Sequence, residues 1–153
     1  MKRPQNEVTV LMVDDDEDDC LLVKEAFVEN HLPSDLRFVR DGEQLMDYLH
    51  RRDRFSDPAA SPCPGLILLD LNMPRKDGRE VLREIKADPR LRHIPVVVLT
   101  TSQEKRDILR SYDLGASSFI TKPVAFDELV EIIRSLGQYW LEIVHLPPTK
   151  DKC

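Results

Sequence analysis

The chain has 153 residues, which is enough for one domain of ordinary size with a full hydrophobic core. Its 28 acidic and 22 basic residues give a formal net charge of −6, which argues against nucleic acid as the main partner because binding to phosphates needs a basic surface. No apolar run is long enough to span a membrane, and the polar residues 1–7 do not form a signal peptide, so we expect a cytoplasmic protein.

The three cysteines support the same compartment. Cys20, Cys63 and Cys153 are odd in number and lack the spacing of a metal site. We therefore expect reduced thiols, as is usual in the cytoplasm.

The first half of the chain begins with Val8–Val13, an apolar run typical of a buried parallel strand. Asp16–Asn30 should be helical, with an acidic first turn that complements the helix dipole and a buried face that includes Leu22, Ala26 and Phe27. The next expected elements are a strand at Leu36–Arg40, a helix at Asp41–Arg52 and a proline-rich surface loop at Phe55–Gly65.

The second half repeats the alternation of short apolar runs and amphipathic stretches. Strands are expected at Leu66–Leu69, Val96–Leu99 and Ser118–Thr121, and helices at Gly78–Ala87, at Glu104–Leu114 and from Phe126 to about His145. Gly115 stands where a helix end favours glycine, and Pro147 and Pro148 stop the last helix. Strands that alternate with helices predict a single doubly wound α/β domain over residues 1–153.

Polar side chains directly follow four of the five runs. Asp14 and Asp15 follow the first run, Asp70 the third, Thr100 the fourth and Lys122 the fifth. The carboxyl ends of parallel strands meet at one edge of a sheet, where open α/β folds bind their ligands. We therefore expect these five side chains to form one site.

Three carboxylates in one crevice repel each other unless positive charge joins them. Lys122 supplies one charge, and Mg²⁺ suits a site made of carboxylates, a backbone carbonyl and water. Asp70 stands alone after a central strand, where its carboxylate can act as a nucleophile towards phosphorus. In such chemistry a lysine and a hydroxyl, here Lys122 and Thr100, hold the remaining phosphoryl oxygens.

Five separated motifs now show a resemblance to a known family. They are Val13–Asp16, Leu69–Pro74 with Asp77 and Gly78, Leu99–Ser102, Gly115 with Ala116, and Thr121–Pro123. In this order and spacing they resemble the receiver domain of two-component response regulators, over roughly residues 8 to 136. The resemblance implies a flavodoxin-like fold with five parallel strands in the order 2-1-3-4-5.

The resemblance also implies roles at the acidic site. Asp70 would be the phosphoacceptor and a ligand of Mg²⁺. Asp15 would bind the ion directly, Asp14 largely through water, and Asn72 through its main-chain carbonyl.

On the other side of the site, the resemblance implies that Thr100 is the switch hydroxyl, Lys122 the phosphate partner and Phe119 the switch aromatic. It further implies a cis bond before Pro123. The chain departs from the family at Ala125, where relatives often have a polar cap, so the start of the final helix is weaker.

The function implied is a signalling protein rather than an enzyme, which accepts a phosphoryl group from a sensor histidine kinase onto Asp70 and catalyses only its own phosphotransfer and dephosphorylation. Only one helix and a short tail follow Pro123, so we expect no output domain and no contact with DNA or membrane. This tail and the proline-rich insertion resemble the small stand-alone regulators of cyanobacterial and bacterial phytochromes, which implies a phytochrome-type kinase.

A homodimer is also expected from the end of the chain. The residues beyond Gly137 add apolar surface that one small domain cannot easily cover: Tyr139, Trp140, Leu141, Ile143, Val144 and Leu146. A two-fold dimer would bury this surface, whereas the competing account is that the segment folds back over its own core.

Three other functions were weighed. A pseudo-receiver that never uses the phosphate is disfavoured by the intact acidic set, and an aspartate-nucleophile phosphatase by Asn72, where that class needs a second aspartate. A calcium loop over Asp14–Glu25 is disfavoured because Asp19 stands where an EF-hand needs glycine. For residues 16–19 we expect a solvated helix start.

Overall fold

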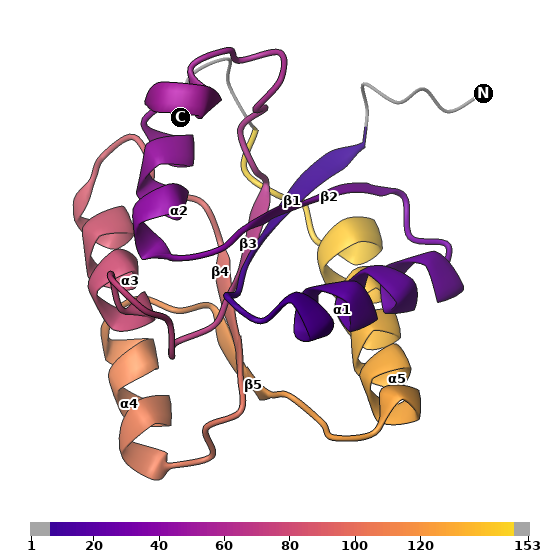
Figure 1. The fold of residues 1–153 in the computed structure, drawn as a ribbon. Helices are drawn as coiled ribbons and strands as arrows, with labels where there is room; N and C mark the ends of the chain where they lie inside the picture. Colours follow the sequence, from indigo (N-terminus) through magenta and orange to yellow (C-terminus); the bar gives the residue numbers. More distant parts are fainter. Residues whose placement is uncertain (1–6, 149–153) are drawn as a thin grey trace.

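The structure is a computed structural model, and it describes residues 7–148. Its centre is one parallel sheet (Figure 1) in the order β2-β1-β3-β4-β5, so the predicted order is confirmed. The strands are β1 (Val8–Val13), β2 (Ser34–Val39), β3 (Leu66–Leu69), β4 (Val96–Thr100) and β5 (Ser118–Thr121).

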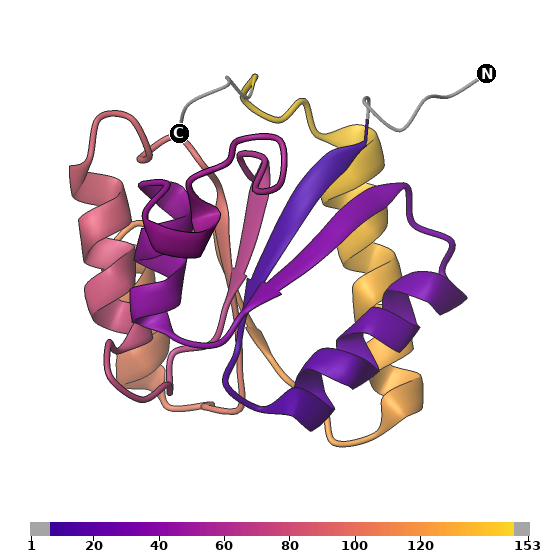
Figure 2. The ribbon, with the colours of Figure 1, turned by 45° about the horizontal axis from the view of Figure 1, so that its top comes forward.

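Helices cover both faces of this sheet. They are α1 (Glu17–Glu29), α2 (Gly42–Leu49), α3 (Gly78–Ala87), α4 (Lys105–Asp113) and α5 (Phe126–Gly137). Helices α1 and α5 lie on one face, whereas α2, α3 and α4 lie on the other (Figures 1 and 2). Successive residues of β1 point to opposite faces, so Leu11 and Val13 pack under α2 and α3 while Val10 and Met12 pack under α1 and α5.

Helix α3 has the predicted bounds because its start is encoded locally. The Asp77 side chain accepts a hydrogen bond from the backbone N–H of the first turn, and Glu80 accepts one from the Asp77 N–H in return. Its apolar face, with Val81, Leu82 and Ile85, is buried against the sheet.

Helix α1 differs from the prediction in its rotation. Ala26 and Phe27 are buried as expected, but Leu22 is 36% exposed, and Val23 is buried in its place. Because Leu21, Leu22 and Val23 are adjacent apolar residues, the sequence alone does not fix which of them lies on the buried face of α1. Packing against α5 places Val23 inwards, and both leucines remain exposed.

The largest differences from the predicted boundaries are in β2, α2 and α5. β2 starts at Ser34 because its register pairs Val8 with Ser34, and α2 ends at Leu49 before a 3-10 turn at Asp53–Phe55. α5 ends at Gly137 and continues as a π-helical turn at Gln138–Ile143, two residues short of His145. The expected weak start of α5 is confirmed, because Ala125 makes no side-chain cap.

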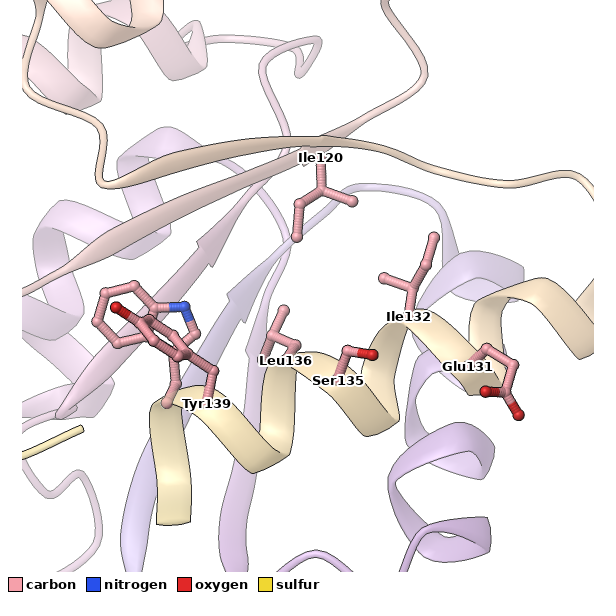
Figure 3. A pocket seen from close by; sticks show the side chains of 7 residues that line it. Ile120, Glu131, Ile132, Ser135, Leu136 and Tyr139 are labelled. Carbon is pink, nitrogen blue, oxygen red and sulfur yellow. The ribbon is translucent and has the colours of Figure 1, made fainter. Parts of the chain in front are cut away.

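The end of α5 borders an apolar groove of about 440 Å³ (Figure 3). Its lining residues are Ile120, Glu131, Ile132, Ser135, Leu136, Tyr139 and Trp140. Trp140 and Leu141 pack against the core of their own chain, whereas Tyr139 is 54% and Ile143 67% exposed. The final segment therefore covers part of the core and still presents apolar surface.

Two smaller expectations need correction. Cys20 is a free, buried thiol as expected, but Cys63 is disulfide-bonded, since bridging depends on distances in the fold rather than on sequence spacing. The expectation for Cys153 lies outside the described residues. The bond before Pro123 is trans, like every described peptide bond, and trans is the intrinsically favoured isomer. Among residues 7–148 no helix is both long and apolar enough to cross a membrane.

Candidate functional site

The five predicted side chains meet at the carboxyl edge of the sheet. Asp14 and Asp15 follow β1, Asp70 follows β3, Thr100 ends β4 and Lys122 follows β5. One carboxylate oxygen from each of the three aspartates lies within 4.8 Å of the others. Parallel strands bring together residues that are more than 100 positions apart, and the predicted convergence is confirmed.

Asp14 is the most buried of the three carboxylates, with no exposed surface. Its Oδ1 accepts the backbone N–H of Asp16 at 2.9 Å, and its Oδ2 accepts a hydrogen bond from Lys122 Nζ at 2.5 Å. Burial raises the pKa of Asp14, and the hydrogen bonds from Lys122 and Asp16 only partly oppose this rise. Burial therefore disfavours the charged form of Asp14, and the hydrogen bond from Lys122 favours it.

Lys122 is the positive centre of the site. Its Nζ donates to Asp14, to Asp19 at 2.8 Å and to Asp70 at 3.5 Å. Burial alone would lower the pKa of Lys122, but the hydrogen bonds with Asp14 and Asp19 outweigh it and raise that pKa. Lys122 is therefore charged throughout the physiological range.

Asp19 was missed in the sequence, where it was expected to be a solvated residue at the start of a helix. Its partner Lys122 is 103 positions away, and no local pattern indicates that pairing. Only the packing of α1 beside α5 brings the first turn of α1 next to the end of β5 (Figure 1).

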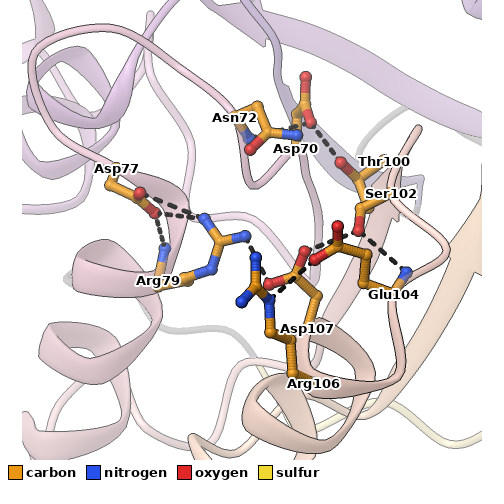
Figure 4. Close-up of polar contacts among 9 residues, drawn as sticks. All are labelled: Asp70, Asn72, Asp77, Arg79, Thr100, Ser102, Glu104, Arg106 and Asp107. Carbon is orange, nitrogen blue, oxygen red and sulfur yellow. Dashed lines mark hydrogen bonds and ion pairs between the residues drawn. The ribbon is translucent and has the colours of Figure 1, made fainter.

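Asp70 is 8% exposed and is held from two sides (Figure 4). Thr100 Oγ1 donates to Asp70 Oδ1 at 2.8 Å, and the Asn72 backbone N–H donates to the same oxygen at 3.2 Å. The Asn72 peptide therefore lies beside the carboxylates. Thr100 is fully buried, and its hydroxyl is a hydrogen-bond donor in the site.

This donor set fits a divalent cation. All candidate ligands are oxygens, which hard ions such as Mg²⁺ prefer. The three carboxylates share one lysine, and this lysine also forms an ion pair with Asp19. A bound dication would remove the repulsion among the carboxylates that burial strengthens.

Phe119 lies outside this cluster. It sits in β5 opposite Val98, two residues before the Thr100–Thr121 pair, and packs against the core under α2 and α3. Its backbone N–H donates to Tyr112 Oη of α4 at 3.2 Å. Phe119 is thus on the same sheet face as Thr100 but makes no hydrogen bond to the site through its ring.

A second polar cluster next to the site was not predicted (Figure 4). Arg79 of α3 donates to Asp107 of α4 at 2.8 Å and to Asp77 at 3.2 Å. Ser102, two residues after Thr100, donates to the other oxygen of Asp107 at 2.6 Å. The cluster connects the loop after β4 to the start of α3. Its central contact joins Arg79 to Asp107 across 28 positions, and no local signal in the sequence indicates that pairing.

Fold and site together define a protein class. A five-stranded 2-1-3-4-5 sheet with an aspartate triad, a threonine and a lysine at its carboxyl edge is the architecture of a receiver domain, and the family model described as "Response regulator receiver domain" matches residues 10–134. The chain belongs to the response regulator receiver family.

Within this family the chain is similar to particular stand-alone response regulators. The chain is 42% identical to the response regulator Rcp1 of Synechocystis over 90% of its own length and 92% of that protein. A Mn²⁺-bound crystal structure of Rcp1 matches with a TM-score of 0.84 and 41% identity, covering 92% of this chain and 99% of that one.

Two further structures are similar. One is the phosphorylated cyanobacterial phytochrome response regulator RcpA, with a TM-score of 0.86 and 42% identity. The other is the response regulator RPA3017 of red light signalling in R. palustris, with a TM-score of 0.88 and 42% identity. Each covers 93% of this chain and 99% of its own. The chain therefore resembles these regulators over nearly their whole length.

Proposed function

We propose that Asp70 accepts a phosphoryl group from a phosphohistidine of a sensor kinase. The observation that carries this proposal is the setting of Asp70, which is nearly buried beside two further aspartates, Lys122 and the Thr100 hydroxyl. One oxygen of Asp70 forms the new bond to phosphorus, while the phosphorus–nitrogen bond breaks and its electron pair stays on the histidine ring. Lys122, whose Nζ lies 3.5 Å from Asp70 Oδ2, would bind the transferred phosphoryl oxygens.

In this proposal Asp14, Asp15, Asp70 and the main-chain carbonyl of Asn72 hold Mg²⁺. The ion would neutralise phosphoryl oxygens as charge shifts during transfer. Buried Asp14 fixes the position of Lys122, and exposed Asp15 is open to the ion and its water. The Mn²⁺-bound form of the relative Rcp1 supports this assignment.

Transfer can be tested with the full chain and acetyl phosphate. We expect one added phosphoryl group per chain by intact mass, dependent on Mg²⁺ and lost with EDTA. Asp70→Asn should abolish the labelling, whereas the exposed control Asp113→Asn should keep it. Wild-type protein that is never labelled would favour the pseudo-receiver alternative instead.

Thr100 and Phe119 are proposed to transmit the change. A phosphoryl group on Asp70 would draw the Thr100 hydroxyl away from its present bond, and the vacated space would admit the Phe119 ring. Reversing a two-state equilibrium requires about 5 kcal/mol of differential interaction, which charge-assisted bonds to phosphate can supply together. Thr100→Ala should thus accept phosphate without the change in NMR spectrum that wild type shows. An equal spectral change in the variant would remove Thr100 from this role.

The proposed partner is a phytochrome-type histidine kinase, because phytochrome and red-light regulators are among the relatives of the chain. A kinase must reach the site from the surface around Lys122. Leu22 and Val124 line this surface, and their side chains are 36% and fully exposed. Val124→Glu should slow transfer from the kinase but not from acetyl phosphate. The protein would then signal through altered protein contacts and catalyse only its own phosphotransfer and dephosphorylation.

A homodimer through the end of α5 is also proposed. The exposed side chain of Tyr139 lines the apolar groove there (Figure 3), and Ile143, four residues further on, is also exposed. A second copy would bury these side chains symmetrically. Tyr139→Ser with Ile143→Ser alters exposed side chains and spares Trp140, which packs on its own core. Light scattering should show dimers for wild type and folded monomers for this variant, and truncation before Tyr139 should also give monomers. A monomeric wild type, with and without phosphate, would contradict the dimer.

A further inference from the structure

The loop that carries Asn72 has its apolar anchors in its first half. Between β3 and α3 the chain runs over residues 70–77, where Leu71 is buried in the core and Met73 is partly buried against it. The far end is closed by Gly78, whose N–H donates to the Leu71 carbonyl at 3.1 Å. A Cβ atom at Gly78 would collide with the Asp70 carbonyl oxygen, so this closure needs glycine. Beyond Met73 the loop relies on the polar contacts of Arg75 and Lys76 for its support.

Asp41 provides that support from the start of α2. It is a buried carboxylate, 3% exposed, and both of its oxygens are used. Oδ1 accepts the Gln44 N–H at 2.8 Å and caps α2, while Oδ2 accepts Arg75 Nη1 at 2.9 Å. A buried carboxylate needs a partner, and Arg75, whose side chain is 62% exposed, reaches in from the surface to pair with Asp41.

The backbone around Arg75 shows that this hold is constraining. Arg75 has a φ of 65°, in the left-handed region that a residue with a side chain rarely adopts. Next to it, the Lys76 carbonyl lies so close to the first residue of α2 that a Cβ atom on Gly42 would collide with it. The loop is therefore pressed against α2 and kept in an unfavourable conformation by its surroundings.

These fixed points leave Asn72 little freedom. Leu71 is buried on one side of it and Arg75 is tied to Asp41 three residues further on. The Asn72 N–H donates to Asp70, which holds the Leu71–Asn72 peptide beside the carboxylates. The Asn72 carbonyl belongs to the next peptide, on the side of Arg75. A change in how Arg75 is held on α2 would therefore reach this carbonyl.

We propose that Asp41 and Arg75 are positioning residues for the divalent cation site. By holding the loop on α2 they fix the Asn72 carbonyl, although neither touches the ion. The inference rests on the proposed function only in that the Asn72 carbonyl is taken as a ligand of the ion.

Calorimetric titration of the metal-free full chain with Mg²⁺ alone tests this inference. Asp41→Asn keeps the cap of α2, because asparagine caps helices as well as aspartate, but presents no charge to Arg75. Arg75→Gly removes the guanidinium and relieves the left-handed backbone, so folding should be preserved. Both variants should raise the Kd for Mg²⁺ by about tenfold, the usual cost of losing a residue that orients a ligand.

A matched control lies on the same helix. Asp47→Asn breaks the Arg52–Asp47 pair, whose side chains are 56% and 32% exposed, and should leave the Kd unchanged. A raised Kd in Arg75→Gly with an unchanged melting temperature would separate positioning from stability. Arg75→Gly and Asp41→Asn with wild-type Kd values would overturn this inference alone. Wild-type protein that neither binds Mg²⁺ nor is labelled by acetyl phosphate would overturn the proposed function as well.

Discussion

Helices α4 and α5 flank the same edge strand but are held in opposite ways. α5 buries Leu129, Ile133 and Leu136 against the sheet and α1, and Asn30 of α1 donates to the Val130 carbonyl at 3.0 Å. In α4 the one buried residue is Ser111, and Leu109 is 66% exposed. α5 is therefore fixed by hydrophobic burial, and α4 is not.

Polar contacts hold α4 in its place. Asp107 in its first turn binds Arg79 and Ser102, and Tyr112 in its last turn accepts the Phe119 N–H. Such contacts are directional and can be exchanged for others at little cost, whereas buried apolar surface is lost in proportion to its area. We therefore expect α4, rather than α5, to shift if Asp70 is phosphorylated.

The largest expected effect on stability comes from the buried apolar face of α5. Ile133 has no exposed surface, so Ile133→Ala should lower the free energy of unfolding by about 2–5 kcal/mol through lost burial and the cavity left behind. Leu109→Ala in α4 should change it by less than about 0.5 kcal/mol. Urea denaturation of both variants measures the contrast, and equal losses would show that α4 is also fixed by burial.

The Arg79–Asp107 pair should have a smaller but clear effect. Its side chains are only 22% and 15% exposed, and a double-mutant cycle with Arg79→Gln and Asp107→Asn should give a coupling energy of about 1–2 kcal/mol. The Arg106–Glu104 pair, with side chains 85% and 59% exposed, is the control and should give about 0–0.5 kcal/mol. A coupling as small as that of the control would mean that α4 is not held by this contact.

The same contact should depend on pH. The hydrogen bonds from Ser102 and then from Arg79 lower the pKa of Asp107. A lowered folded-state pKa means that the contribution is complete above the unfolded value near 3.8 and is lost as the pH falls through the folded-state value. The stability difference between wild type and Asp107→Asn should stay constant from about pH 8 to 5 and shrink below about pH 4. A difference that already declines at neutral pH would contradict this assignment.

The smallest expected effect is a gain in stability from a substitution at Ser111. The Ser111 hydroxyl of α4 is buried, and no hydrogen-bond partner for it occurs among the described residues. Ser111→Ala removes this cost and favours the helix, so it should stabilise the protein by about 0.5–1 kcal/mol, seen as a higher melting temperature. A loss of stability would show that the hydroxyl has a partner, such as a buried water.

Local patterns in the sequence were enough for the elements and for the location of the site. Short, mainly apolar runs gave β1, β3 and β5 with their observed bounds, and the Asp77–Glu80 capping box and the apolar stripe gave α3. Strand order followed from family resemblance. Because parallel strands end at one edge, the meeting of Asp14, Asp70 and Lys122 was also predictable.

Tertiary structure alone decided the contacts that tune this site. Lys122 with Asp19, Arg75 with Asp41 and Arg79 with Asp107 pair residues that are 103, 34 and 28 positions apart. The inward turn of Val23 and the exposure of Leu22 likewise follow from how α1 packs on α5. Hydrophobic periodicity and capping act within one or two helical turns, whereas charges on separate elements become partners only after packing fixes the distance between them.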